Sequence, residues 1–339
     1  MPRCAAWLVR GVLPLGLAIG LAVPPAAAQL SLVAVAGKAS SPARHAAPAA
    51  PANLPQRVVG GYFTTWDDGL DLRKVVDTTS YNVIYLAFAI GVSPSSGALQ
   101  LDLPSWAASP ADVKSQIAYA NAHGRKVLVS VGGWFDLPGQ RSGYRLDTAA
   151  KVDQLMTSMR ALRSAWGFNG MDWDLEHGER TDRAGIVDAS RRMRAEFGSA
   201  WIICFAPGVN LASWVGTGGI LDTLGTGGWD AVGEQIYDQG LSQTSYRSLI
   251  VDRMRTLVAK YGAAKVILGN KFRPDSGTAM NDPSNGCVDI ATTRAALSDL
   301  RARGTNIRGA FSWTVQSDAA VGGPWQGKNG VGGDVLAHP

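Results

Sequence analysis

A regular alternation of short apolar runs with longer helix-like segments, from residue 57 to residue 312, constrains the fold more than any other feature. Eight runs have the length and the β-branched or aromatic content of strands. They are Val58–Phe63, Val83–Ala89, Lys126–Val131, Gly170–Leu175, Ile202–Ala206, Ala231–Tyr237, Val266–Gly269 and Ile307–Ser312. The best-defined helical segments between them carry apolar residues at steps of three and four. These are Pro110–His123, Asp147–Trp166, Thr181–Phe197, Ser242–Tyr261 and Val288–Arg303.

Eight strand–helix units in about 265 residues predict an α/β fold of the (β/α)8 TIM barrel type. A doubly wound sheet is the alternative. The number of strands favours the barrel, and no phosphate-binding glycine motif follows the first strand. The connection between the seventh and eighth strands is short and includes one helix, so we expect no inserted domain there.

The fourth predicted strand carries three carboxylates at alternate positions, Asp172, Asp174 and Glu176, with large apolar side chains between them. A strand has a side-chain period of two, so the three acids share one face. Like charges about 7 Å apart are unfavourable unless they share protons or face a ligand. In a barrel, catalytic groups lie at the carboxyl ends of the strands. We therefore expect Glu176 at the mouth, with Asp174 and Asp172 progressively deeper. A salt-bridge network with nearby arginines is the alternative.

The segment Asn169–Glu176 (NGMDWDLE) resembles the DxxDxDxE signature of the family 18 glycoside hydrolases, the chitinase family, with Asn in the first position. Because Asn169 is out of parity with the three acids, we interpret it as structural support. Ser130-Val131-Gly132-Gly133, at the end of the third strand, resembles the SxGG motif of the same family. Other strand ends match too: Gly61-Tyr62-Phe63, Ala206-Pro207, Gln235-Ile236-Tyr237-Asp238 and Trp313. The resemblance covers about residues 57–315.

This resemblance implies four catalytic residues and a substrate-assisted, retaining mechanism. Glu176 would protonate the glycosidic oxygen and later act as the base. Asp174 would bind the acetamido N–H of the sugar, and Asp172 would share a proton with Asp174. Tyr237 would donate its hydroxyl to the acetamido oxygen as that oxygen attacks the anomeric carbon.

The resemblance also implies a set of substrate-binding residues. Trp313 would form the floor of the subsite that holds the acetamido sugar. The other members are Asp238, Tyr62, Gly133, Trp134 and Gln235. The few histidines and scattered cysteines have no metal-ligand spacing, so we expect no metal and no cofactor.

The N-terminus has the pattern of a signal peptide over residues 1–28. Arg3 and Arg10 precede or flank the apolar run Gly11–Val23, and Ala26-Ala27-Ala28 fits a cleavage site. The run is too short for a transmembrane helix, although an uncleaved anchor is an alternative. Residues 29–55 are rich in Ala, Pro and Ser and predict a spacer. Residues 56–339 would be the catalytic barrel of a secreted protein, either extracellular or periplasmic.

Charge and cysteine content restrict the partners. The net charge is +5, and +5 − 2 = +3 without the two leader arginines, with no basic block. We expect no nucleic-acid binding, no membrane association after cleavage, and a monomer. Cys4 would leave with the leader, and Cys204 and Cys287 permit either one disulfide or buried free thiols.

The sequence therefore predicts a secreted chitinase that hydrolyses β-1,4 linkages between N-acetylglucosamine units in chitin or its oligosaccharides. Without an inserted domain we expect a shallow cleft and endo-type attack. No separate carbohydrate-binding module is visible in the sequence, so we expect a preference for soluble oligomers or amorphous chitin. One alternative is an endo-β-N-acetylglucosaminidase acting on N-glycans. The other is an inactive chitin-binding lectin or inhibitor on the same barrel, although such relatives commonly lack the acid that Glu176 supplies.

Overall fold

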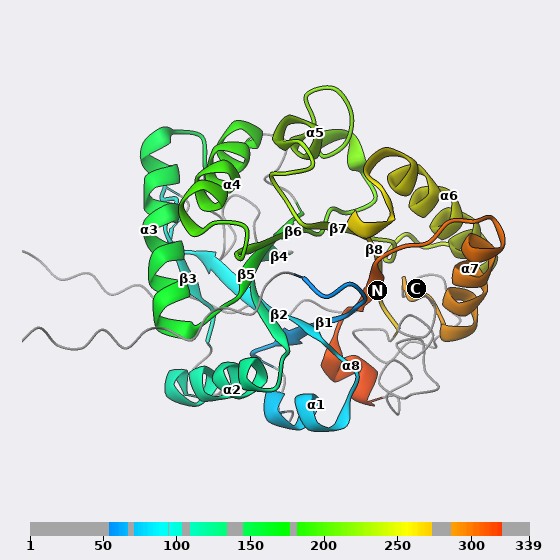
Figure 1. Cartoon of the computed structure of the whole chain (residues 1–339), viewed down its shortest axis with the longest axis horizontal. Coiled ribbons are helices and arrows are strands. Elements are labelled where there is room, and N and C mark those ends of the chain that lie inside the picture. The colour runs from blue at the N-terminus through cyan, green and yellow to red at the C-terminus, as the bar shows by residue number, and fades with distance from the viewer. Residues whose placement is uncertain are drawn as a thin grey trace, which may run out of the picture. The chain divides into compact units, whose positions relative to one another are not determined.

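The computed structural model describes residues 54–66, 71–93, 95–103, 109–133, 145–176, 182–272 and 286–320. Eight parallel strands form a closed barrel, in which each strand pairs with its neighbours and the last pairs with the first. They are β1 (Val58–Thr64), β2 (Val83–Gly91), β4 (Lys126–Gly133), β5 (Gly170–Leu175), β6 (Ile202–Phe205), β7 (Ala231–Gln235), β8 (Val266–Asn270) and β9 (Gly309–Ser312). The predicted TIM barrel is confirmed, and Figure 1 shows the strands at the centre of a ring of helices.

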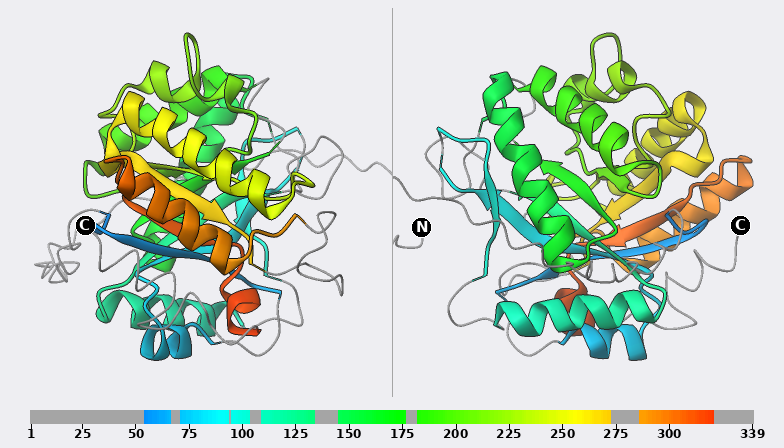
Figure 2. Two further views of the ribbon diagram at one scale, coloured as in Figure 1. Left: turned by 90° about the vertical axis from the view of Figure 1, so that its right-hand side faces the viewer. Right: turned by 60° about the vertical axis from the view of Figure 1, so that its left-hand side comes forward.

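The helices follow the strands and cover the outside of the barrel (Figure 2). They are α1 (Leu72–Thr78), α2 (Pro110–Ala122), α3 (Ala149–Trp166), α4 (Arg183–Phe197), α5 (Ile220–Leu224), α6 (Gln243–Tyr261), α7 (Ile290–Ala302) and α8 (Val315–Ala320). Side-chain caps explain several starts: Ser109 accepts from the Asp112 backbone N–H, and Ser242 accepts from that of Ser245. None of the helices in the described ranges is long and apolar enough to cross a membrane.

The structure corrects several predicted boundaries. Strand β7 ends at Gln235 rather than Tyr237, because the chain then leaves the ladder and reaches a positive φ of 57° at Asp238. The last strand begins at Gly309 rather than Ile307. The short elements α1, α5 and α8 were not predicted, nor was β3 (Leu99–Leu101), which pairs antiparallel with the end of β2. Elements this short contain too few residues for a clear period.

Two separate apolar cores result from the alternation along the strands. One lies between the barrel and the helices and includes Met171 and Trp173. The other fills the barrel interior and includes Tyr62, Tyr85 and Phe311. Side chains that point inward are therefore surrounded by other strands and can meet at the carboxyl end of the barrel.

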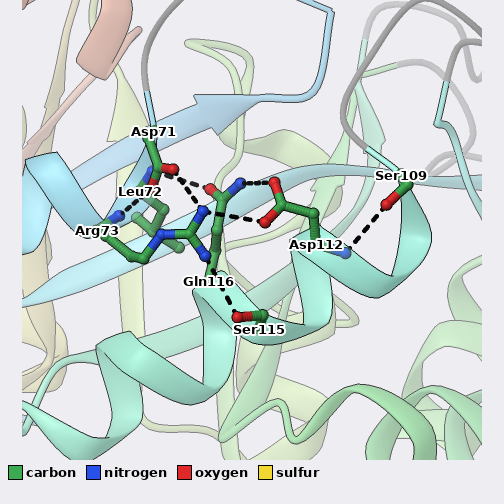
Figure 3. A network of polar contacts seen from close by, with 7 residues as sticks. All are labelled: Asp71, Leu72, Arg73, Ser109, Asp112, Ser115 and Gln116. Carbon is green, nitrogen blue, oxygen red and sulfur yellow. Dashed lines mark hydrogen bonds and ion pairs between the residues drawn. The ribbon is translucent and has the colours of Figure 1, made fainter.

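A polar network connects the beginning of α1 with the beginning of α2 (Figure 3). Arg73 contacts Asp71 at 2.7 Å and Asp112 at 3.0 Å. The buried Gln116 donates to Asp112 and accepts from the Leu72 backbone N–H at 2.9 Å. The charged members are about a third or more exposed, so each ion pair stabilises the fold little. The network joins the first turn of α1 to the first two turns of α2.

Candidate active site

Two of the three carboxylates on β5 lie inside the barrel. Asp172 and Asp174 are 1% and 2% exposed, and Trp173 between them packs on the helix side. Glu176 follows the last residue of the strand and is half-buried. The predicted inward direction is confirmed for Asp172 and Asp174, and Asp172 is the deeper of the two.

Asp172 is held by two hydroxyl groups from neighbouring strands. The Tyr62 hydroxyl on β1 and the Ser130 hydroxyl on β4 both donate to its Oδ2, at 2.8 and 2.9 Å. Burial disfavours the charged form and raises the pKa of Asp172 to about 6, while the two hydrogen bonds act in the opposite direction. Burial therefore makes Asp172 easier to protonate than an aspartate in water.

Asp174 is held by Gln235, the last residue of β7. The Gln235 side-chain amide donates to Asp174 Oδ1 at 2.6 Å and to the Ala206 carbonyl at 2.9 Å. This fixes one carboxylate oxygen of Asp174 against the end of β6. The sequence predicted Gln235 as a substrate-binding residue but did not predict this contact. The contact depends on which inward-pointing residues of β5 and β7 lie at the same height along the barrel axis.

Aromatic rings cluster around Tyr62, the residue whose hydroxyl holds Asp172. Trp313, directly after β9, is half-buried, and its ring centroid lies 5.4 Å from that of Tyr62 and 5.9 Å from that of Phe88. Trp66 also stacks with Phe88, at 5.9 Å. Phe88 was not predicted as a site residue. A bulge in β2 between Ala87 and Ala89 lets Phe88 join the interior core, and strand parity does not reveal a bulge.

The segment after β7 brings two predicted residues and one unpredicted residue together. Tyr237 is buried and belongs to the interior core, whereas Asp238 is exposed. Asp238 forms an ion pair at 2.9 Å with the ammonium group of Lys271, whose side chain is only 4% exposed. Lys271 follows β8, and the signal that could have identified it is a lysine directly after an apolar strand. Asp238 also donates its backbone N–H to Gly286, where an added Cβ would lie 2.1 Å from Asp238 Oδ1.

The SxGG glycines allow close packing around the acids. Gly132 has φ +115°, and a Cβ there would lie 2.2 Å from the Asp174 carbonyl oxygen. Gly133 has φ +78°, and a Cβ there would lie 2.6 Å from Phe88. Only glycine satisfies both conditions. Trp134, the next predicted residue, lies outside the described residues.

Asn169 has the supporting role that its parity predicted. Its side-chain oxygen accepts the Val127 backbone N–H at 2.8 Å, and its backbone pairs with β4 and β6. Cys204 and Cys287 are both buried and are not joined by a disulfide. Among the residues the structure describes, no group of three or more His, Cys, Asp or Glu side chains could hold a metal ion.

Comparison with known proteins gave partial sequence matches and broad structural ones. The chain matches no family model. It is 32% identical over 164 residues to Chitinase Chi52 of Paenibacillus xylanexedens and 30% identical over 167 residues to Chitinase D of Niallia circulans. Each match covers 43% of this chain, but only 29% and 30% of the relatives, so the chain spans under a third of their length.

Solved structures match most of the chain. A putative Chitinase A from Streptomyces coelicolor superposes with a TM-score of 0.67 and 25% identity, over 83% of this chain and 99% of that one. A fungal endo-β-N-acetylglucosaminidase of glycosyl hydrolase family 18 has a TM-score of 0.57 at 22% identity, over 77% and 90% of the two chains. The xylanase and α-amylase inhibitor XAIP-II of Scadoxus multiflorus has a TM-score of 0.63 at 18% identity, over 84% and 99%. The last two likenesses show the shared barrel alone. With the acidic row on β5 and the two glycines on β4, these similarities confirm that the chain resembles the family 18 glycoside hydrolases.

Proposed function

We propose that the chain is a chitinase that cleaves β-1,4 linkages between N-acetylglucosamine units, with Glu176 as the general acid and base. The observation that carries this proposal is the set of three carboxylates on β5 and directly after it. The two deeper acids are buried and hydrogen-bonded, the third lies at the carboxyl end, and Trp313 stands beside Tyr62 over the same end. Such a row suits a reaction that needs one proton donor and a stabiliser of positive charge.

In the proposed first step, Glu176 gives its proton to the glycosidic oxygen as the bond to the anomeric carbon breaks. The acetamido carbonyl oxygen of the same sugar forms a new bond to that carbon, giving an oxazolinium ion. Asp174 accepts a hydrogen bond from the acetamido N–H and balances the charge. The Gln235 amide, which already occupies one Asp174 oxygen, fixes the direction in which the other oxygen faces.

In the second step, water attacks the anomeric carbon and transfers a proton to Glu176. The oxazolinium ring opens, and the β configuration is retained. Asp172, with its pKa raised to about 6 by burial, shares a proton with Asp174 as the charge on the sugar rises and falls.

The remaining predicted residues would bind the sugar. Tyr237 donates its hydroxyl to the acetamido oxygen, and Trp313 presents its ring to the pyranose C–H groups. Asp238, joined to Lys271, offers a charged pair to sugar hydroxyls at the mouth. Residues 1–28 would direct secretion.

The decisive experiment compares the wild type with Glu176→Gln on N-acetylglucosamine oligomers, measuring new reducing ends. We expect the variant to lose at least about 100-fold in kcat, because general acid catalysis contributes roughly that factor or more. Equal thermal unfolding of the two proteins is the control. An inactive wild type, or an equally active variant, would contradict the proposal.

A parallel assay on a high-mannose glycoprotein distinguishes the two enzymatic alternatives. Release of the glycan without cleavage of the oligomers would assign an endo-β-N-acetylglucosaminidase. Binding of chitin without cleavage of either substrate would assign a lectin, and the presence of both Glu176 and Asp174 disfavours that result.

A further inference from the structure

Another buried carboxylate lies next to the site, on the opposite face of the barrel wall. Glu234 precedes Gln235 on β7 and points outward toward α6. It is 0% exposed, and neither of its carboxylate oxygens accepts a hydrogen bond from any residue in the described part of the chain. Burial raises the pKa of Glu234 to about 8, partly offset by Arg253. A carboxyl group in this position is unfavourable for packing alone.

Arg253, on α6, connects Glu234 to a second segment of the barrel wall. Its Nε lies 3.3 Å from Glu234 Oε1, and its Nη2 donates to the carbonyl oxygen of Val209. The guanidinium group therefore spans from β7 to the chain that leaves β6. Its planar fork can hold two acceptors in a fixed relation.

These two segments are the ones that hold Gln235. The Gln235 backbone N–H donates to the Pro207 carbonyl at 2.8 Å, and its side chain donates to the Ala206 carbonyl at 2.9 Å. Gly208 also forms a β-bridge with Gln235. The position of segment 206–209 relative to β7 thus determines where the Gln235 amide points, and this amide holds Asp174.

We propose that Arg253 and Glu234 are positioning residues for the candidate active site, which act by fixing segment 206–209 against β7 so that Gln235 orients Asp174. The kinetic part of this inference rests on the proposed function. Asp174 would bind the acetamido group most strongly in the transition state, so a looser Gln235 should lower kcat more than it changes KM.

The chain provides a matched control on the same helix. Arg247 also lies on α6 and forms an ion pair with a carboxylate, that of Asp299 on α7, at 2.7 Å. This pair faces solvent, with the Arg247 side chain 48% exposed, and its contacts are on the helix layer. A general contribution of α6 ion pairs to stability would affect both arginines, whereas positioning requires Arg253.

The first experiment measures kcat and KM on N-acetylglucosamine oligomers for Arg253→Gln and Arg247→Gln. We expect Arg253→Gln to lose roughly ten-fold in kcat with little change in KM, and Arg247→Gln to retain wild-type values. In a Gln235→Ala background, Arg253→Gln should lower kcat almost no further, because the Gln235 side chain that Arg253 would position is absent. Equal losses in both backgrounds, or equal losses for both arginines, would overturn the proposal.

Glu234→Leu separates positioning from stability. An apolar side chain of similar size removes the cost of burying a carboxyl group that accepts no hydrogen bond in the described structure. The Arg253 side chain is 32% exposed and stays in contact with solvent, so we expect the protein to be as stable or more stable. The same change removes the β7 partner of Arg253, so we expect kcat to fall several-fold. A variant that is stable and retains full kcat would contradict the inference. Arg253→Lys, which keeps the charge but not the fork, should give an intermediate kcat and serves if Arg253→Gln does not fold.

A readout without substrate separates this inference from the proposed function. The side-chain amide resonances of Gln235, observed by NMR, report its hydrogen bonds to Asp174 and Ala206. We expect them to move in Arg253→Gln and to stay in place in Arg247→Gln. If the wild type cleaves no oligomer, the proposed function fails while this comparison still stands. If the resonances are unchanged in Arg253→Gln, the positioning role fails even in an active enzyme.

Discussion

The inner and outer faces of the barrel wall each bury a carboxylic acid, and the two acids differ in the hydrogen bonds that they accept. Asp172 on the inside accepts hydrogen bonds from two hydroxyl groups, and its pKa rises only to about 6. Glu234 on the outside accepts none within the described structure, and its pKa rises to about 8. Burial raises both pKa values; the hydroxyl donors Tyr62 and Ser130 oppose the rise at Asp172, and the charge of Arg253 opposes it at Glu234. Donated hydrogen bonds hold the inner acid, whereas the outer acid faces only the guanidinium group of Arg253, at 3.3 Å.

The largest expected effect is on activity. Asp174→Asn should lose at least about 100-fold in kcat on N-acetylglucosamine oligomers, because the neutral amide no longer balances the developing positive charge. Glu234→Gln, which keeps an acceptor for Arg253, should stay within roughly three-fold of the wild type. Steady-state kinetics on both purified variants checks this, and comparable losses would remove the functional distinction between the two faces.

The next effect is on stability as a function of pH. The folded pKa of Glu234, about 8, lies above its unfolded value of about 4.3. The folded state therefore binds more protons between these two values, and stability falls as pH rises through this window. Glu234→Gln should remove that slope, so that its advantage over the wild type grows from pH 5 to pH 8. Urea unfolding at several pH values measures the slope, and parallel curves would contradict the assignment.

Removing one donor to Asp172 should give a smaller effect. Tyr62→Phe deletes a hydrogen bond that favours the charged form, so the pKa of Asp172 should rise above about 6. Stability should fall by about 1 kcal/mol. Tyr81→Phe is the matched control, because the buried Tyr81 hydroxyl donates to another carboxylate, that of Asp318, at 3.0 Å. It should lower stability similarly and leave the Asp172 titration, followed by NMR, unchanged.

The smallest effect concerns a third, exposed carboxylate. Asp238 is half-exposed, so its ion pair with Lys271 should contribute less than about 1 kcal/mol to stability. Lys271→Met should leave the melting temperature almost unchanged and alter KM for the oligomers by a few-fold, if the pair binds sugar hydroxyls. An unchanged KM would assign the pair to the structure of the mouth alone.

Local patterns predicted much of this molecule. The eight apolar runs identified all eight barrel strands, since strands buried on both faces are recognisable as short β-branched segments. The alternation of Asp172, Asp174 and Glu176 predicted the order of depth of the acids, and the odd position of Asn169 predicted its supporting role. These properties depend on the chain's own period of two, which holds wherever the strand is placed.

Contacts between strands could not be predicted in this way. The stagger of β5 to β8 around the barrel decides that Gln235 holds Asp174 and that Lys271 pairs with Asp238. The rotation of α6 decides that Arg253 contacts both Glu234 and Val209. The bulge that brings Phe88 inward breaks the period itself. The sequence by itself determined the barrel and the row of acids on β5, because both follow from local periodicity. Only the tertiary structure decided which neighbours hold those acids in place, because that depends on register between strands far apart in the chain.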